Sequence, residues 1–353
     1  MWPFKKRWVP FVGIDISSSV IKLIELSRPD SGYRVESYAA VPLPSNAISE
    51  RNIVDVEAVG EAIKKAVKRS GTRTKLASVA VSGSAVITKT ISLSANLSED
   101  EMEAQIQVEA DQYIPFPLEE VYLDFQRLKP SLKNPEMVDV LLVASRRENI
   151  DLRVNAIEQG GLTARVVDIE AYAMEKAFSL VVDQVPDEGN HKTVAMIDVG
   201  ATMTTLNVLY DQHIIYNREQ VFGGRQLTER IQRHYGVSYE EAGEAKRKGG
   251  LPDDYGPAVL SPFREEMAQQ VSRSLQFFFS STQYDKVDII LLSGGTVSIP
   301  DAAQIIEART GAPTVIANPF ANMSLASRVN AQALFSDASS LMIACGLTLR
   351  SFD

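Results

Sequence analysis

Two stretches of the sequence align without a gap: VGIDISSSVIKLIEL at residues 12–26 and AMIDVGATMTTLNVL at residues 195–209. In each stretch an apolar strand ends at an aspartate, Asp15 or Asp198, before a run of small residues and a second strand-like segment. This order is typical of a tight β-hairpin. One such hairpin is an ordinary turn, whereas two copies separated by half a chain indicate an internal duplication.

The turns of the two hairpins have the composition of phosphate-binding loops. They correspond position by position, with Ser17, Ser18 and Ser19 in the first and Gly200, Ala201 and Thr202 in the second. Small residues let a ligand approach the backbone and offer N–H and hydroxyl donors, which suits phosphate. Each aspartate is placed to reach Mg²⁺, directly or through water, as this ion prefers beside phosphate ligands.

The composition is that of an ordinary globular protein. Domains average roughly 150 residues, so 353 residues suggest two domains or one bilobed unit. With 36 Lys and Arg against 45 Asp and Glu, the net charge of -9 disfavours a non-specific nucleic-acid binder. The single cysteine, Cys345, excludes a disulfide framework and a thiolate zinc site and fits the reducing cytosol.

The apolar runs are short. The longest, such as residues 138–143 and 289–292, fall far short of the roughly 18 to 20 residues that a membrane span requires, so we predict no transmembrane helix. The basic N-terminus lacks the long apolar region of a secretory signal. Aromatic residues alternating with basic ones in residues 2–8 can contact an anionic membrane surface, although a frayed positive tail is the simpler interpretation.

Between and after the hairpins, strands alternate with amphipathic helices, which predicts an α/β fold. We expect a helix over residues 56–70, strands over 76–81 and 86–92, and a capped helix over 98–113. The sequence contains no P-loop, no GxGxxG after the first strand and no GxSxG elbow, which disfavours P-loop enzymes, Rossmann dehydrogenases and hydrolases. The three histidines are scattered without carboxylates at metal-ligand spacing.

The ordered series of two aspartate hairpins, Gly223-Gly224, Gly294-Gly295-Thr296 and a closing Ala-Cys-Gly helix resembles the actin, Hsp70 and hexokinase ATPase superfamily. Longer motifs narrow the resemblance to the PilM family of type IV pilus assembly, which is in turn similar to FtsA. These motifs are DISSSVIKLIEL, SGSAVITKTI, EADQYIPFPLEEV, DVGATMTTL, FGGRQLTERI, SRSLQFFF and IACGLTLRSFD.

The resemblance implies an α/β, actin-like (ribonuclease H-like) fold of two lobes that grip ATP and Mg²⁺, with an FtsA-type 1C insert. The implied division is a tail at 1–11, subdomain 1A at 12–87, 166–187 and 336–353, 1C at 88–165, 2A at 188–225 and 287–335, and 2B at 226–286.

Carried over by position, the resemblance implies a set of nucleotide-binding residues. Lys22 and Thr204 join the two phosphate loops, and Asp15 and Asp198 serve the metal. Glu170 matches the residue that positions the attacking water, although a helix-capping role is equally open. Because Ala201 replaces an acidic residue of actin, at most slow ATPase activity is expected. The implied ribose and adenine contacts are Gly223, Gly224, Glu241, Lys246, Gly294, Gly295 and Thr296.

The resemblance also implies a cytoplasmic ATP-binding scaffold for pilus assembly and twitching motility, peripheral at the inner membrane of a Gram-negative bacterium. It would hold the cytoplasmic N-terminal tail of PilN, and through it contact PilO, the pilus motor ATPases and the platform protein. The sequence ends at Asp353 without the terminal membrane helix of FtsA, so we expect tethering through a partner. Whether copies associate into a homo-oligomer is left open.

The expected groove for the PilN tail lies between the first lobe and the insert. An acidic and aromatic helix end, halted by Pro115, can offer carboxylates and a ring to an extended basic peptide; a solvated helix face is the competing interpretation. Its residues are Glu109, Asp111, Gln112 and Tyr113. The alternative function is a small-molecule kinase of the same superfamily, which needs a general base beside an acceptor pocket that the sequence does not display.

Overall fold

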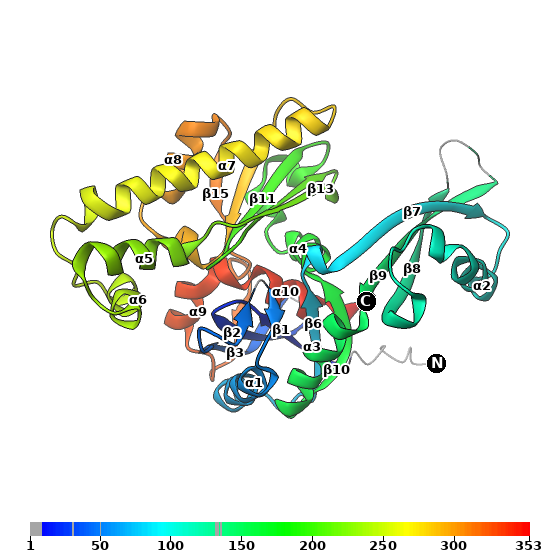
Figure 1. Ribbon diagram of the computed structural model, residues 1–353, viewed down its shortest axis with the longest axis horizontal. Coiled ribbons are helices and arrows are strands. Elements are labelled where there is room, and N and C mark those ends of the chain that lie inside the picture. Colours follow the sequence, from blue (N-terminus) through cyan, green and yellow to red (C-terminus); the bar gives the residue numbers. More distant parts are fainter. Residues whose placement is uncertain (1–8, 30–31, 50, 131–133, 135) are drawn as a thin grey trace.

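The computed structural model describes residues 9–29, 32–49, 51–130, 134 and 136–353. Most of the N-terminal tail therefore lies outside the described residues. Figure 1 shows two lobes, each built on its own sheet, with an arm that projects from the first lobe. The arrangement confirms the α/β class predicted from the alternation of strands and helices.

The first lobe is built on a mixed six-stranded sheet. Its order is β10 (Thr163–Ile169), β6 (Leu76–Val81), β1 (Val12–Ile16), β2 (Val20–Ser27), β3 (Arg34–Pro42) and β16 (Ser324–Leu325). One face packs against α1 (Val56–Ser70) and α3 (Arg147–Gln159), whose Ile63 and Ile157 share a core with Ile14. The side chain of Asp55 caps α1 by accepting a hydrogen bond of 2.9 Å from the amide of Ala58.

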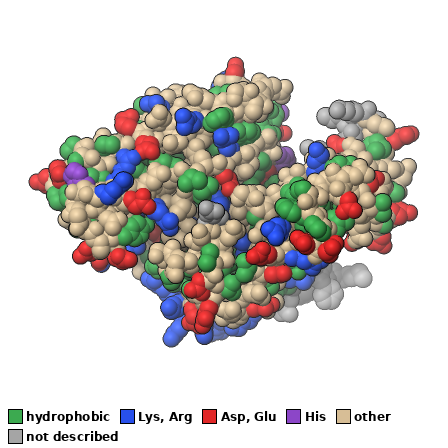
Figure 2. Space-filling view, viewed as in Figure 1, with side chains coloured by type: hydrophobic (Ala, Val, Ile, Leu, Met, Phe, Trp, Pro, Cys, Tyr) green, Lys and Arg blue, Asp and Glu red, His purple; other side chains and the backbone are tan. Residues whose placement is uncertain are grey.

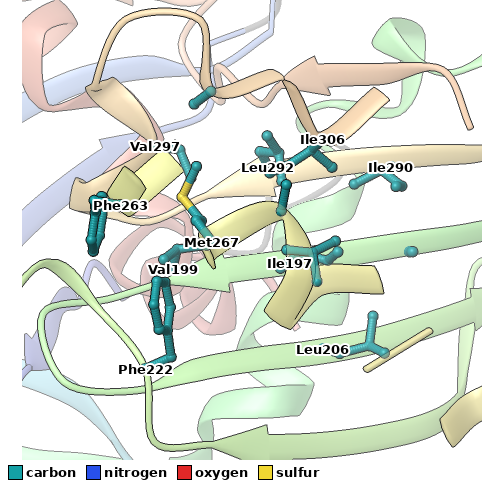
Figure 3. Packing of buried hydrophobic residues seen from close by; sticks show 14 of the residues in the cluster. Ile197, Val199, Leu206, Phe222, Phe263, Met267, Ile290, Leu292, Val297 and Ile306 are labelled. Carbon is teal, nitrogen blue, oxygen red and sulfur yellow. The ribbon is translucent and has the colours of Figure 1, made fainter. Parts of the chain in front are cut away.

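The second lobe is built on a five-stranded sheet. Its order is β13 (His213–Gln220), β12 (Thr204–Tyr210), β11 (Thr193–Val199), β14 (Ile289–Ser293) and β15 (Thr314–Ile316). Helices cover one face: α5 (Gly224–Tyr235), α6 (Tyr239–Lys248), α7 (Ser261–Ser281) and α8 (Ala302–Thr310). Figure 3 shows Ile197 and Val199 of β11 in this core with Met267 of α7, as alternation along a strand requires.

The duplication predicted from the sequence is present in the structure. In the first lobe β1 pairs antiparallel with β2, so that Asp15 lies opposite Lys22. In the second lobe β11 pairs in the same way with β12, and Asp198 lies opposite Thr205. Each first strand also has a parallel neighbour on its other side, β6 or β14. The two lobes therefore repeat one arrangement.

Two helices lie between the sheets: α4 (Glu170–Phe178) and α10 (Met342–Leu349). Met174 and Met342 pack with Met196 of the second sheet, while α10 also contacts β1. The helices approach each other at backbone distance, because a Cβ on Gly346 would lie 1.7 Å from the carbonyl oxygen of Ala173. The two helices therefore pack tightly against each other where the lobes meet.

The helical run from Ala331 to Phe352 is long and apolar enough to cross a membrane by length and composition alone. Polar residues interrupt its apolar ones, so it was not predicted from the length of uninterrupted apolar runs. It contains α9 (Ala331–Asp337) and α10, and 61% of its most apolar window is buried. Leu334, Leu341 and Leu349 lie in the core of the first lobe, which gives the apolar composition a packing explanation.

The arm is a three-stranded sheet with one helix. Its strands are β7 (Val86–Ser94), β9 (Met137–Arg146) and β8 (Val121–Pro130), in that order, and its helix is α2 (Glu99–Glu109). The helix expected over residues 98–113 thus ends earlier and continues as a 3₁₀ turn at Ala110–Gln112. Although α3 falls within the range expected for the insert, it packs on α1 of the first lobe. Similarly, β16 falls within the range expected for subdomain 2A of the second lobe, but it pairs with β3 of the first sheet.

Candidate nucleotide cleft and insert surface

The turns of the two hairpins meet between the lobes. The hydroxyl of Thr202 donates a hydrogen bond of 3.1 Å to that of Ser18, across 184 residues of sequence. Ser17 holds the first turn tight, because its hydroxyl donates to the carbonyl of Val20 at 2.8 Å. The structure thus brings together the two loops that the sequence predicted as phosphate-binding.

The charged groups behind these turns form a compact cluster. The ammonium group of Lys22 lies 2.9 Å from Asp15 Oδ2, and Asp198 accepts a 3.0 Å hydrogen bond from Ser293. Burial raises the pKa of Asp198. The charge of Lys22 and the hydrogen bond from Ser293 lower it, but they offset only part of the rise. Burial alone would lower the pKa of Lys22, but the two aspartates outweigh it and raise the pKa, so this lysine stays charged.

The described residues contain no group of three His, Cys, Asp or Glu side chains that could hold a metal ion. Mg²⁺ nonetheless commonly binds proteins through only one or two carboxylates, with nucleotide phosphates and waters as its other ligands. Asp15 and Asp198 supply that number of carboxylates at the ends of matched strands. The donor set therefore fits Mg²⁺ bound together with a phosphate ligand.

Two glycine-containing segments of the second lobe approach the turn that contains Gly200. Its carbonyl accepts hydrogen bonds from the amide of Gly224 at 3.0 Å and from the hydroxyl of Thr296 at 2.7 Å. A Cβ on Gly223 would lie 2.5 Å from the same oxygen, and one on Gly294 would lie 2.3 Å from the carbonyl of Val199. Only glycine allows this approach of the β11–β12 turn to the start of α5.

The remaining glycine in this region, Gly295, begins a 3₁₀ turn that ends at Ser298. Thr204, expected near the phosphates, is buried and donates to the carbonyl of Phe222 at 3.0 Å. Its hydroxyl thus holds β12 to the segment before α5. Ala201 accepts a hydrogen bond from the amide of Arg225 through its carbonyl.

Lys246 is a partly buried cation held by neutral groups. Its ammonium donates to the carbonyl of Gly224 at 3.0 Å and to the hydroxyl of Thr228 at 2.7 Å. Burial, with a smaller effect of Arg247, lowers its pKa to about 8. Glu241, predicted to share its role, is exposed, and its carboxylate accepts from the amide of Ser238 in a helix capping box.

Glu170 begins α4 and forms an ion pair with Arg51. A small pocket between the lobes is lined by Glu170 and Asp198, by the amide side chains of Asn207 and Asn217, and by Glu219. The residues of this region that were not predicted from the sequence are Arg51, Asn207, Asn217, Glu219 and Ser293. The position of Ser293 directly before Gly294-Gly295 was a usable signal, whereas Arg51 lies in a short connection with no motif.

The predicted partner-binding residues lie at the end of α2. Asp111 and Gln112 are exposed, Glu109 accepts a hydrogen bond of 2.8 Å from Gln105, and Tyr113 packs on the core of the arm. Figure 2 shows acidic side chains along the arm, at the right of the view.

A separate hollow lies where the arm joins the first lobe, and its lining shares no residue with the predicted set. Among its residues are Ala85, Ile87, Phe116, Ala144 and Arg146. The guanidinium of Arg146 lies 5.6 Å from the ring centroid of Phe116. The lining of the hollow is therefore mostly apolar, and Arg146 is its charged residue.

Comparison with known proteins identifies the family. The family described as type IV pilus assembly protein PilM matches residues 13–352. The chain belongs to the PilM family. A solved structure described as a PilM-PilN type IV pilus biogenesis complex has a TM-score of 0.80 and 27% sequence identity, and the match covers 98% of this chain and all of that one.

More distant relatives are consistent with the actin-like fold expected from the resemblance. The ethanolamine utilization protein EutJ from Carboxydothermus hydrogenoformans has a TM-score of 0.56 at 15% identity, covering 96% of this chain and 89% of that chain. Cell division protein FtsA of Bacillus subtilis (strain 168) is 23% identical over 262 residues. That match spans 68% of this chain and 58% of FtsA. Together with the PilM-PilN match, these relatives confirm the two-lobed actin-like fold.

Proposed function

We propose that this chain is a cytoplasmic scaffold of the type IV pilus machinery that binds ATP with Mg²⁺ between its lobes and holds the N-terminal tail of PilN beside its arm. The observation that carries the nucleotide site is that the turns of the two duplicated hairpins meet, with Lys22 paired to Asp15 and the charge of Asp198 also raising the pKa of Lys22. Two phosphate loops and a buried cation suit a polyphosphate ligand.

In this proposal the role of each residue follows from its position. The hairpin turns receive the phosphates, Asp15 and Asp198 hold Mg²⁺, and Lys246 with the glycine segments lies toward the nucleoside. When bound, Mg²⁺ would neutralise phosphate charge and orient the terminal phosphate. We expect slow hydrolysis, because Ala201 supplies no carboxylate to hold water and Glu170 is occupied by Arg51.

The proposed binding of PilN is supported by the similarity of this chain to the solved PilM-PilN complex. The hollow lined by Phe116 is mostly apolar, and the exposed Asp111 lies on the turn that precedes Phe116 in the chain. An extended peptide with apolar and basic side chains fits such a surface. Binding PilN would place the chain at the inner membrane, near PilO and the pilus motor.

Calorimetry with ATP, with and without Mg²⁺, tests the nucleotide site. Asp198→Ala should lose metal-dependent binding, while Asp285→Ala, which changes an exposed aspartate of the same lobe, should bind as wild type does. Unchanged affinity in the folded Asp198→Ala protein would refute the assignment. A turnover on the order of tens per second, as in metabolic kinases, would contradict the scaffold role.

Titration of the PilN tail peptide tests the surface on the arm. Phe116→Ala and the double variant Glu109→Lys, Asp111→Lys should weaken binding. The control Asp100→Lys, Glu103→Lys introduces the same charges at exposed positions earlier in α2 and should bind as wild type does. Wild-type affinity in both test variants would show that the peptide binds elsewhere.

A further inference from the structure

Arg51 connects the two lobes through charge. Its guanidinium forms an ion pair with Glu170 at the start of α4 and lies 3.6 Å from Glu219 Oε1 on β13. The three side chains are only 16%, 18% and 12% exposed, in that order. Arg51 belongs to the first lobe, beside β5 (Asn52–Ile53), whereas Glu219 belongs to the second sheet. One arginine of the first lobe therefore contacts a carboxylate of the second sheet as well as Glu170.

The backbone of Arg51 is fixed by a second arginine. Arg153 of α3 is 3% exposed and donates hydrogen bonds to the carbonyls of Arg51, Ala80 and Asn149, at 3.1, 2.8 and 2.9 Å. Within the described part of the chain it forms no ion pair. A buried guanidinium without a carboxylate is costly unless its donors are satisfied, and here one of them is satisfied by Arg51.

The conformation of Arg51 makes that hydrogen bond consequential. Its φ of 68° lies in the left-handed region, which is unfavourable for a residue with a Cβ. Two-residue hairpin turns adopt this conformation, and Arg51 lies in such a turn because Ser49 and Asn52 pair across it; the hairpin and the bond from Arg153 together hold the residue. The bond from Arg153 to the Arg51 carbonyl is therefore positioned to keep the Arg51 side chain directed at Glu170 and Glu219.

We propose that Arg51 is a latch that holds the two lobes closed, and that Arg153 is the residue that positions it. The role of the latch in nucleotide exchange rests on the proposed function, but its effect on lobe closure does not. Exchange requires the lobes to part, which separates Arg51 from Glu219. While the latch is closed, Arg51 also neutralises Glu170 and so limits the ability of this carboxylate to orient water.

A spin-label distance measurement on nucleotide-free protein tests closure directly. Labels at Lys68→Cys on α1 and Lys248→Cys on α6 report from exposed sites in different lobes, and native Cys345 is buried. Arg51→Met should lengthen or broaden the distance distribution. The control Arg230→Met removes an arginine–glutamate ion pair within the second lobe alone and should leave the distribution unchanged. A wild-type distribution in a folded Arg51→Met protein would overturn the latch.

Release of a fluorescent ATP analogue with Mg²⁺, followed by stopped flow, tests the consequence. Arg51→Met and Glu219→Gln should each accelerate release by roughly tenfold, within the usual range of coupling between two states. Failure of wild type to bind the analogue would refute the proposed nucleotide function, while the label distances would still decide the latch. Binding with wild-type release in both variants would refute control of exchange.

The positioning role of Arg153 is tested by combining variants. If Arg153 acts through Arg51, Arg153→Met should accelerate release, and Arg51→Met combined with Arg153→Met should release no faster than Arg51→Met alone. Arg153→Lys should restore part of the wild-type rate, because it keeps a cation that can donate to the Arg51 carbonyl. Additive effects of the two methionine variants would show that Arg153 acts independently of the latch.

Discussion

Replacing Lys246 by methionine should change how the stability of the protein depends on pH. In the folded chain the pKa of Lys246 is lowered from its ordinary 10.5 to about 8, first by burial and then by Arg247. Between these values the unfolded chain binds more protons than the folded one. The free energy of unfolding of wild type therefore rises with pH across this window. Methionine keeps the length of the side chain and removes the titrating group.

The size of the effect follows from the two pKa values. At about 1.36 kcal/mol for each pH unit, the shift corresponds to roughly 3 kcal/mol. Most of this appears between pH 7 and pH 10. Methionine also loses the hydrogen bonds to Gly224 and Thr228, each worth on the order of 1 kcal/mol. We therefore expect similar stability of the two proteins near pH 7 and a less stable variant, by roughly 2 kcal/mol, near pH 10.

Urea unfolding at several pH values gives the required comparison. The difference in unfolding free energy between wild type and Lys246→Met cancels groups that titrate equally in both proteins. The control is Lys248→Met, on the same helix, because Lys248 is exposed and paired with Glu244. The difference in unfolding free energy between this control and wild type should not depend on pH between 7 and 10. Parallel stability curves for wild type and Lys246→Met would refute the inference that Lys246 is buried without a counter-charge.

Two further changes probe the junction and the metal site. Gly346→Ala should destabilise the protein by about 3 kcal/mol or more in urea unfolding, because the new Cβ meets the Ala173 backbone. The control Gly243→Ala on α6, whose new Cβ would come no closer than 3.8 Å to Thr228, should cost far less. Ser293→Ala removes a hydrogen bond that lowers the pKa of Asp198. As pH is lowered, this variant should lose Mg²⁺-dependent ATP binding at a higher pH than wild type, and coincident profiles would contradict the reasoning.

The parts of the fold that were predictable are those encoded by local patterns. Asp15 and Asp198 terminate apolar strands followed by small residues, and both hairpins formed where the alignment of the two stretches places them. Helix α1 has the bounds expected from its apolar spacing, because Asp55 caps one end and Gly71 adopts the left-handed conformation at the other. Patterns of this kind depend on neighbours within a few residues.

Contacts between distant residues could not be read in the same way. Arg51 and Glu219 are separated by nearly half the chain and belong to no motif, so their proximity depends on how the lobes close. The placement of α3 is similar: it follows β9 of the arm directly in sequence, but Ile157 fits the core beside α1. The apolar face of α3 packs in the first lobe, so α3 belongs there although it is adjacent to the arm in the sequence.

The charge balance of the cleft indicates how a nucleotide would have to bind. Among the described residues behind the hairpin turns and in the adjoining pocket, the cations are Lys22 and Arg51, and the carboxylates are Asp15, Glu170, Asp198 and Glu219. The carboxylates outnumber the cations before any phosphate arrives. Because like charges at close range in a partly buried site are strongly unfavourable, a free polyphosphate would be repelled. We therefore expect ATP to enter only as its Mg²⁺ complex, with the metal supplying the positive charge that the side chains lack.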